Sequence, residues 1–325
     1  MKQLTFIAVL LAASMALSAC APRPTPPPTV VTVQLHWTHH SQFAGFYAAD
    51  QNGYYAAEGL TVVFLEGGAT VDFIAPVLEG KAQFGVAGGD HLLIGRAEGK
   101  PVRAIATIYR RSPTVYMALA SSGITRPHDF VGKKIQISPA GVPLLRAMTA
   151  RVGLRSDQYT VVDSTPDLEP FYSGEVHVRG GFVTNEVLTA QNAGYKLNLI
   201  YPDDYGVHIY SDTLFTTDEL IARNPDLVRR FLRATLQGWT YAVEKPTTIG
   251  AMVLKYKPDA DPNFENAKMA ASLQLVNTGE DFIGWMKPEV WAGMEKTFRE
   301  QGVLVKPLDV TQVYTLQFVQ EIYQK

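Results

Sequence analysis

Short strand-like segments alternate with helix-like segments along most of this chain, and this alternation constrains the fold more than any other feature. Residues 31–35 alternate apolar and polar side chains, as a half-buried strand does, and residues 61–65 are mainly β-branched or apolar. A helix is predicted between them at 45–52, ending at Gly53. Because strands that alternate with helices usually form a mostly parallel sheet covered on both faces, the sequence predicts an α/β protein.

The same pattern continues to about residue 214 and divides into two units. In the first unit we expect further strands at 84–86, 102–109 and 115–120, and helices at 71–80 (capped by Thr70) and 90–99. The second unit starts near residue 120, with expected strands at 135–137, 159–162, 181–183 and 197–201 and helices at 142–153 and 186–192. A strand at 207–214 is predicted to return the chain to the first unit.

Helical patterns dominate after residue 215. Thr216 and Glu219 have the spacing of a capping box, and Asn224 before Pro225 is typical of a helix start. Apolar residues with a period of 3.6 between 227 and 243 predict one long helix whose apolar stripe belongs to the core. Further helices are expected at 288–300 and 311–323.

An α/β unit, a second unit inserted into it, and a return to the first predict two lobes joined by two crossover strands. We expect residues 31–118 and 211–325 to form lobe 1 and residues 119–210 to form lobe 2. Ligands of α/β proteins bind at the carboxyl ends of strands and at domain interfaces, so a ligand cleft is predicted between the lobes. Closure around the ligand would be a hinge motion.

The N-terminus is predicted to be a targeting segment. Lys2 precedes an apolar run at 4–16 that is too short to span a bilayer comfortably but has the length of a signal-peptide core. The run ends at Leu17-Ser18-Ala19-Cys20, which resembles a lipobox, so we expect a lipoprotein signal peptide at 1–19 and a lipidated Cys20. An ordinary cleaved signal or an uncleaved anchor is the alternative. The proline-rich stretch that completes residues 20–30 is expected to be a spacer or a disordered tail.

Composition excludes several classes of function. A net charge of −2 without a basic run argues against nucleic acid as a partner. Cys20 is the single cysteine, which excludes an intramolecular disulfide and a cysteine-based zinc or iron–sulfur site. No nucleophile elbow, dinucleotide-binding pattern or P-loop is present. His36, His39 and His40 have no carboxylates at ligand spacing, so a solvated loop is expected rather than a metal site, and no cofactor is predicted.

Candidate ligand-binding side chains follow the first predicted strand. Trp37, Phe43 and Tyr47 offer flat apolar faces on which a ring could stack, and Gln42 offers an amide that donates and accepts. The alternative, which the sequence leaves open, is that these aromatic rings face the core.

Further candidates lie at other predicted strand ends. Gly88 and Asp90 open a helix whose free N–H groups suit a carbonyl or an anion, although a plain strand-to-helix turn fits equally well. The remaining candidates for stacking or hydrogen bonding to a ligand are Tyr109, Ser112, Ser138, Asn185 and Glu186. Asn185 has a structural alternative, because it is also suited to cap the following helix.

Several motifs in order along the chain resemble one family. These are Trp37 with Gln42-Phe43-Ala44-Gly45-Phe46-Tyr47-Ala48-Ala49, Gly53-Tyr54-Tyr55, Glu58-Gly59-Leu60, Gly80-Lys81-Ala82-Gln83-Phe84-Gly85-Val86, Arg111-Ser112-Pro113 and Thr184-Asn185-Glu186. From about residue 31 to the C-terminal helices, the chain resembles substrate-binding proteins related to thiamin-pyrimidine synthase, within a larger group that includes alkanesulfonate-binding proteins.

The resemblance implies a two-lobe, periplasmic-binding-protein-like (type II) fold and a lipoprotein on the extracytoplasmic face of the cell membrane. The implied partners are the permease and ATPase of an ABC importer. Among such proteins the chain looks most like those that bind riboflavin, and relatives that bind thiamin-precursor aminopyrimidines supply the alternative ligand. A synthase activity is not expected, because the related synthases use a cysteine-containing iron site and this chain has no cysteine for one.

Overall fold

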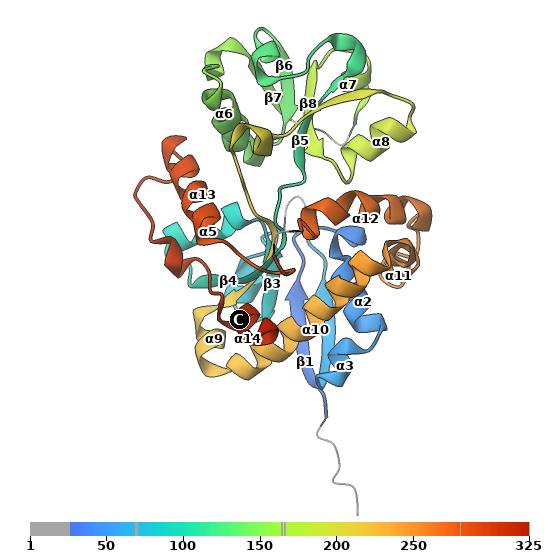
Figure 1. The fold of residues 1–325 in the computed structure, drawn as a ribbon, viewed down its shortest axis with the longest axis vertical. Helices are drawn as coiled ribbons and strands as arrows, with labels where there is room; N and C mark the ends of the chain where they lie inside the picture. Colours follow the sequence, from blue (N-terminus) through green and yellow to red (C-terminus); the bar gives the residue numbers. More distant parts are fainter. Residues whose placement is uncertain (1–26, 69–70, 164, 166, 280, 325) are drawn as a thin grey trace, which may run out of the picture.

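The structure is a computed structural model that describes residues 27–68, 71–163, 165, 167–279 and 281–324 of the 325-residue chain. It contains two five-stranded sheets, each with helices against it, stacked along the long axis of the molecule (Figure 1). The predicted α/β class and the two-lobe arrangement are confirmed. The predicted signal peptide and Cys20 lie outside the described residues.

The sheet of lobe 1 has the strand order β2-β1-β3-β10-β4. Its strands are β1 (Thr29–Gln34), β2 (Leu60–Leu65), β3 (Phe84–Ala87), β4 (Val102–Tyr109) and β10 (Ser211–Thr217). β1 pairs with β2 and β3 in parallel, whereas β10 is antiparallel to both β3 and β4. The sheet is therefore mostly parallel, with one reversed strand that returns from lobe 2.

Most of the helices belong to lobe 1. They are α2 (Ala44–Gln51), α3 (Tyr54–Ala57), α4 (Ala75–Leu78), α5 (Gly89–Ala97), α9 (Asp218–Arg223), α10 (Pro225–Glu244), α11 (Ile249–Val253), α12 (Pro262–Val276), α13 (Pro288–Glu300) and α14 (Gln317–Tyr323). Short 3-10 turns in this lobe are η1 (Ser41–Phe43), η7 (Pro246–Thr248) and η8 (Val310–Gln312).

Lobe 2 has the strand order β7-β6-β8-β5-β9. Its strands are β5 (Thr114–Leu119), β6 (Lys134–Ile137), β7 (Thr160–Asp163), β8 (Val178–Phe182) and β9 (Leu197–Ile200). Its helices are α6 (Val142–Arg151), α7 (Glu169–Tyr172) and α8 (Glu186–Asn192), with 3-10 turns η2 (Ala120–Ser122), η3 (Pro127–Phe130), η4 (Pro139–Gly141), η5 (Ser156–Gln158) and η6 (Pro202–Tyr205).

The topology turns the carboxyl ends of the parallel strands of each lobe toward the other lobe. In lobe 1, the chain leaves from Tyr109 and re-enters at Ser211, and these residues are paired at the carboxyl end of β4. In lobe 2, the chain enters β5 at Thr114, which is paired with Phe182 at the carboxyl end of β8. We call these two strand-end regions the facing edges; a ligand held between the lobes would touch both (Figure 1).

The core of lobe 1 is built around a close crossing of α2 and α10. A Cβ added at Gly45 would lie 2.2 Å from the ring of Trp239, and one at Gly238 would lie 2.1 Å from the Gly45 carbonyl oxygen. Only glycine at these two positions lets the helix backbones approach so closely. The apolar stripe predicted for the long helix is confirmed as core, because Leu227, Phe231 and Trp239 are buried.

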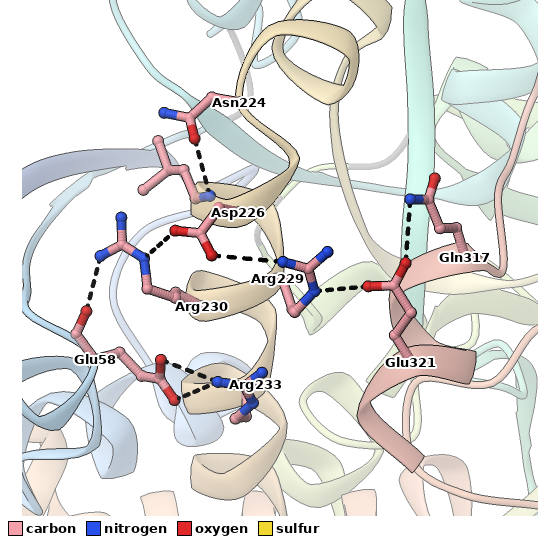
Figure 2. Close-up of polar contacts among 9 residues, drawn as sticks. Glu58, Asn224, Asp226, Arg229, Arg230, Arg233, Gln317 and Glu321 are labelled. Carbon is pink, nitrogen blue, oxygen red and sulfur yellow. Dashed lines mark hydrogen bonds and ion pairs between the residues drawn. The ribbon is translucent and has the colours of Figure 1, made fainter. Parts of the chain in front are cut away.

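An ion-pair network ties the outer side of α10 to its neighbours (Figure 2). Arg229 pairs with Glu321 of α14 at 2.6 Å, and Arg233 pairs with Glu58 after α3 at 3.0 Å. Arg230 donates to the Glu58 carbonyl oxygen at 2.8 Å. Three helices that are distant in sequence are therefore held together on the surface of lobe 1.

Helix α13 joins the two lobes through apolar contacts. Its buried residues Trp291, Met294 and Phe298 belong to the same apolar cluster as Leu145 and Met148 of α6 in lobe 2. One side of the junction between the lobes, where α13 lies near α6 (Figure 1), is therefore an apolar seam.

Some expectations about the elements were wrong. The lobe boundary expected at residue 118 falls inside β5, which pairs with β8 and β9 of the second sheet, so the crossing lies before Thr114. The return strand begins at Ser211 rather than 207, and Thr217 rather than Thr216 caps the next helix by accepting from the Leu220 N–H. The helix expected at 71–80 is short, and its expected cap, Thr70, lies outside the described residues.

Four helices were missed, and one was shorter than expected. α3, α7, α11 and α12 had no predicted counterpart, and α14 covers only the second half of the helix expected at 311–323. Of the helices that the structure describes, none is both long and apolar enough to cross a membrane.

Candidate functional site

Asp212 is the centre of the polar cluster at the facing edge of lobe 1. It lies near the start of β10 and is 2% exposed. Its carboxylate accepts two hydrogen bonds from the Gln42 amide, at 2.9 and 2.8 Å, and a contact of 2.9 Å joins it to Nε2 of His36. The Ser211 hydroxyl donates to it at 3.1 Å. Three side chains therefore contact this buried carboxylate where the chain returns from lobe 2.

The backbone of Asp212 is strained as well as buried. Its φ is +47°, in the left-handed region that only a few per cent of non-glycine residues adopt, mostly asparagine, aspartate and histidine. Such strain persists where the surroundings fix the residue, and it is common at binding sites and switch regions. The hydrogen bonds from Gln42 and His36 supply that fixation.

Helix α12 fixes the loop that carries His39 to Gln42. The buried carboxylate of Glu265 accepts from the Ser41 N–H at 2.6 Å and pairs with Lys268 at 2.9 Å. Burial and the nearby positive charge of Lys268 hold the pKa of His40 well below its usual value. A neutral His40 fits its role, because its Nδ1 accepts from the Gln42 N–H at the start of η1. The loop that presents Gln42 is thus held from two sides.

An aromatic group lies behind this loop. Tyr47 stacks on Tyr256 with 4.3 Å between ring centroids, and its hydroxyl is 2.8 Å from Nδ1 of His39. Burial raises the pKa of Tyr47 and lowers that of His39. Both groups are therefore neutral hydrogen-bonding partners at neutral pH.

Gly88 and Asp90 lie at the start of α5 on the same facing edge. Asp90 is 3.0 Å from Nδ1 of His91, and a Cβ at Gly88 would meet the Asp90 carboxylate at 2.2 Å. Burial raises the pKa of Asp90, but the charge and hydrogen bond of His91 outweigh it and lower that pKa, while Asp90 raises the pKa of His91. The pair thus places an acidic and a basic side chain in contact beside the helix N-terminus.

The facing edge of lobe 2 carries the other predicted polar residues. Glu186, in the first turn of α8, accepts from the Phe182 N–H at 2.8 Å, and Asn185 donates to Glu186 at 3.2 Å. Asn185 makes no side-chain cap bond with α8, in contrast to the capping alternative. Ser138 is exposed at the end of β6, and Ser112 lies in the first crossing segment, where it accepts from the Thr114 N–H.

The predicted aromatic residues differ in position. Trp37 follows β1 at the facing edge and is 44% exposed, so its ring remains free to contact a ligand. Phe43, Tyr47 and Tyr109 are fully buried, so the expectation that their ring faces line a cleft is wrong for this structure. Protein neighbours already occupy those faces: Tyr109 packs edge-on against Trp239 and donates to Ser272 at 2.7 Å.

Sequence reasoning missed three residues of the lobe 1 edge. Asp212, Glu265 and Lys268 lie far along the chain from the His36–Gln42 segment and reach it only through the return strand and α12. Among the described residues, no group of three or more histidine, cysteine or acidic side chains is arranged to hold a metal ion. A pocket of 380 Å³ lies away from both facing edges, where α6 meets the end of α13 at Gln301.

Two sheets, two crossing segments and polar facing edges define the two-lobe fold of periplasmic binding proteins. The aliphatic sulphonate binding protein SsuA of Escherichia coli has this fold, with a TM-score of 0.68, 14% identity and coverage of 89% of this chain and 92% of that chain. The chain belongs to the family described as NMT1/THI5 like, which matches residues 40–249. The family membership predicted from the motifs is confirmed.

Two curated relatives extend over nearly the whole chain. The riboflavin-binding protein RibY of Chloroflexus aurantiacus is 29% identical, covering 94% of this chain and 90% of its own length. The 4-amino-5-hydroxymethyl-2-methylpyrimidine phosphate synthase of Legionella pneumophila is 25% identical, covering 89% of this chain and 92% of its own length. The family therefore includes proteins named for binding and proteins named for synthesis.

Proposed function

We propose that this chain is the extracytoplasmic substrate-binding lipoprotein of an ABC importer, that it binds riboflavin between its lobes, and that lipid on Cys20 anchors it to the cell membrane. The ligand would lie across the two facing edges. The protein would deliver this ligand to a permease driven by the partner ATPase, and it would catalyse no chemical step.

The buried Asp212 cluster is the observation that carries a binding role. Its charge is already satisfied by Gln42 and His36, which makes the lobe 1 edge a rigid surface rather than a set of reactive groups. The exposed ring of Trp37 on the same edge suits a flat heterocycle. Similarity to RibY over most of both chains supports riboflavin as that heterocycle.

The alternative ligand is a thiamin-precursor aminopyrimidine, and similarity to the synthases supports it. Synthase activity itself is disfavoured, because the sequence offers only Cys20, in the predicted lipobox, for a cysteine-containing iron site. A three-ring flavin needs a larger contact surface than a single pyrimidine ring, so the two ligands predict different binding enthalpies and different dependence on Trp37.

Titration of the purified protein with riboflavin, followed by flavin fluorescence and calorimetry, tests the proposal. We expect a Kd of roughly micromolar or tighter, equivalent to about −8 kcal/mol. Trp37→Ala should weaken binding at least roughly tenfold without changing thermal stability, because an exposed ring can stack on the ligand but adds little to the packing of the core.

Unchanged flavin fluorescence together with no heat of binding would remove riboflavin. Binding of 4-amino-5-hydroxymethyl-2-methylpyrimidine in the same cell would then support the alternative ligand. An unchanged Kd for Trp37→Ala, with riboflavin still bound, would place the stacking surface elsewhere.

A further inference from the structure

Arg179 of β8 is a buried cation whose hydrogen-bonding capacity is largely unused. It is 4% exposed, and its Nη2 donates to the Thr165 carbonyl oxygen at 2.6 Å. Its Nε and Nη1 have no hydrogen-bond partner within the part of the chain that the structure describes. Buried donors without partners are costly and rare in native proteins, so each calls for an explanation such as an absent ligand.

The guanidinium of Arg179 lies at the facing edge of lobe 2. Thr165, which accepts from it, lies two residues beyond Asp163, the last residue of β7. Arg179 and Gly181 point to the same face of β8, because side chains alternate along a strand. On that face a Cβ at Gly181 would lie 2.8 Å from Cβ of Glu186, so Glu186 covers the strand end beside Arg179.

The charges around Arg179 support this placement. Burial lowers the pKa of Arg179, while the carboxylates of Glu186 and Asp167 raise it, which places both acids near the guanidinium. Neither acid makes a hydrogen bond to it within the described chain, although Glu186 accepts from Phe182. The neighbouring Gln136 of β6, in register with Arg179, also keeps a buried side-chain oxygen without a partner.

We propose that Arg179 and Glu186 bind the carbonyl–N–H–carbonyl edge of a cyclic imide, the edge that the pyrimidinedione ring of a flavin presents. The free N–H groups of Arg179 donate to a ring carbonyl oxygen, and the Glu186 carboxylate accepts from the ring N–H. This assignment rests on the proposed function and adds to it which two residues would contact one end of the ligand. A hydroxymethyl aminopyrimidine lacks this carbonyl–N–H–carbonyl edge and offers ring nitrogens and a hydroxyl as acceptors instead.

Four ligands separate this inference from the proposed function. Calorimetry of the full-length protein would compare riboflavin, 3-methylriboflavin (which lacks the imide N–H), 6,7-dimethyllumazine (which keeps the imide edge on a smaller ring system) and 4-amino-5-hydroxymethyl-2-methylpyrimidine. We expect riboflavin to bind at least roughly tenfold more tightly than its 3-methyl analogue, because Glu186 would lose its donor.

Two variants test which residue contacts the ring carbonyl and which contacts the ring N–H. Arg179→Gln should weaken riboflavin binding roughly 10- to 100-fold, as expected for a lost hydrogen bond to a charged group. Glu186→Gln should reduce the preference for riboflavin over 3-methylriboflavin. Arg155→Gln is the matched control, because Arg155 is an exposed arginine of the same lobe that pairs with Asp157. Thermal melts check the fold, and if Arg179→Gln does not fold, the ligand series and Glu186→Gln decide.

The outcomes distinguish the two claims. The imide site is overturned if riboflavin and 3-methylriboflavin bind with equal affinity and neither Arg179→Gln nor Glu186→Gln changes the affinity for riboflavin. The proposed function would then still stand. Binding of the lumazine without riboflavin removes riboflavin as the ligand and supports the imide site. Binding of the aminopyrimidine alone, or of none of the four compounds, overturns both.

Discussion

The two facing edges differ in how completely their buried ionisable and amide side chains are satisfied. In lobe 1, buried Asp212 and Glu265 each have several hydrogen-bonding or ionic partners, and the one buried side-chain group of the site loop left without a partner among the described residues is the neutral hydroxyl of Ser41. In lobe 2, buried Arg179 and Gln136 keep atoms without partners among the described residues. The difference indicates a division of roles: lobe 1 is organised before the ligand arrives, and lobe 2 is completed by the ligand.

The lobes also differ in how tightly their backbones are packed. A Cβ added at Gly45 in lobe 1 would meet the rigid ring of Trp239 at 2.2 Å, whereas a Cβ added at Gly180 in lobe 2 would lie 2.8 Å from the terminal carbon of Ile137. An indole buried in a helix crossing has little room to move, while the end of an isoleucine can rotate. Lobe 1 should therefore tolerate added volume less well than lobe 2.

The largest expected effect tests this contrast in packing. Gly45→Ala should lower the free energy of unfolding by about 3 kcal/mol, because the new methyl group overlaps the Trp239 ring. Gly180→Ala, the matched change in lobe 2, should cost about 1 kcal/mol or less. Urea denaturation of both variants measures the difference. Equal losses would contradict the view that lobe 1 is the more rigid lobe.

A second prediction concerns the Asp212 cluster. Asp212→Ala should cost about 2 kcal/mol of stability, since it leaves the Gln42 amide buried without its acceptor. Asp212→Asn is the control, because asparagine tolerates the left-handed backbone and keeps an acceptor oxygen. The free energy of unfolding in urea and the affinity for the ligand should both be highest for wild type, lower for Asp212→Asn and lowest for Asp212→Ala. An Ala variant as stable as wild type would show that Asp212 does not organise this edge.

The third prediction is a pH dependence that belongs to lobe 1. In the unfolded chain, His40 takes up a proton near its ordinary pKa of 6.5. In the folded protein, His40 is harder to protonate, because burial lowers its pKa and so do the nearby side chains Lys268, His36, His39 and Lys257. The unfolded state therefore binds more protons below pH 6.5, and stability should fall as the pH drops from 7 to 5.

His40→Asn isolates this contribution, because asparagine can also cap η1 but does not titrate. Its stability should decline less than that of wild type over the same range, measured by thermal melts at each pH. His128→Asn in lobe 2 is a control at an exposed histidine far from the lobe 1 edge. Parallel pH profiles for wild type and His40→Asn would exclude His40 as the source.

The smallest expected effect lies on the outer surface of lobe 1. Arg229→Ala removes the ion pair with Glu321 and should cost only about 0.5 kcal/mol, because both side chains are partly exposed to solvent (Figure 2). The loss should shrink further in 1 M salt, where the charges are screened. A loss of several kcal/mol would contradict the view that solvent weakens this surface pair.

Local patterns were enough to predict the fold class, the inserted lobe and most strands, because alternation and helix caps act over a few residues. They could not assign β5 to the second sheet, since its pairing with Phe182 depends on residues far along the chain. α12 was missed because its apolar residues do not gather on one face, although Asp261 before Pro262 is a helix start. Its absence hid Glu265, which fixes the site loop.

The site itself was less predictable than the fold. Gln42, Trp37 and Glu186 were predicted because they follow strands, where α/β proteins place ligand-binding groups, and the structure places them at the facing edges. Asp212 and Arg179 sit inside strands, where sequence gives no sign that a charged side chain is buried. Phe43 and Tyr109 were misplaced because an aromatic residue next to a strand end has the same pattern whether its ring faces the ligand or the core.

The paired positions of Tyr109 and Ser211 limit how the lobes can move. Both tethers leave lobe 1 side by side, so lobe 2 can tilt about a line through them but cannot easily rotate around the long axis of the molecule. The seam between α6 and α13 lies on one side of that line. We expect ligand-driven movement to follow a single angle, so one pair of distance labels across the facing edges would describe it.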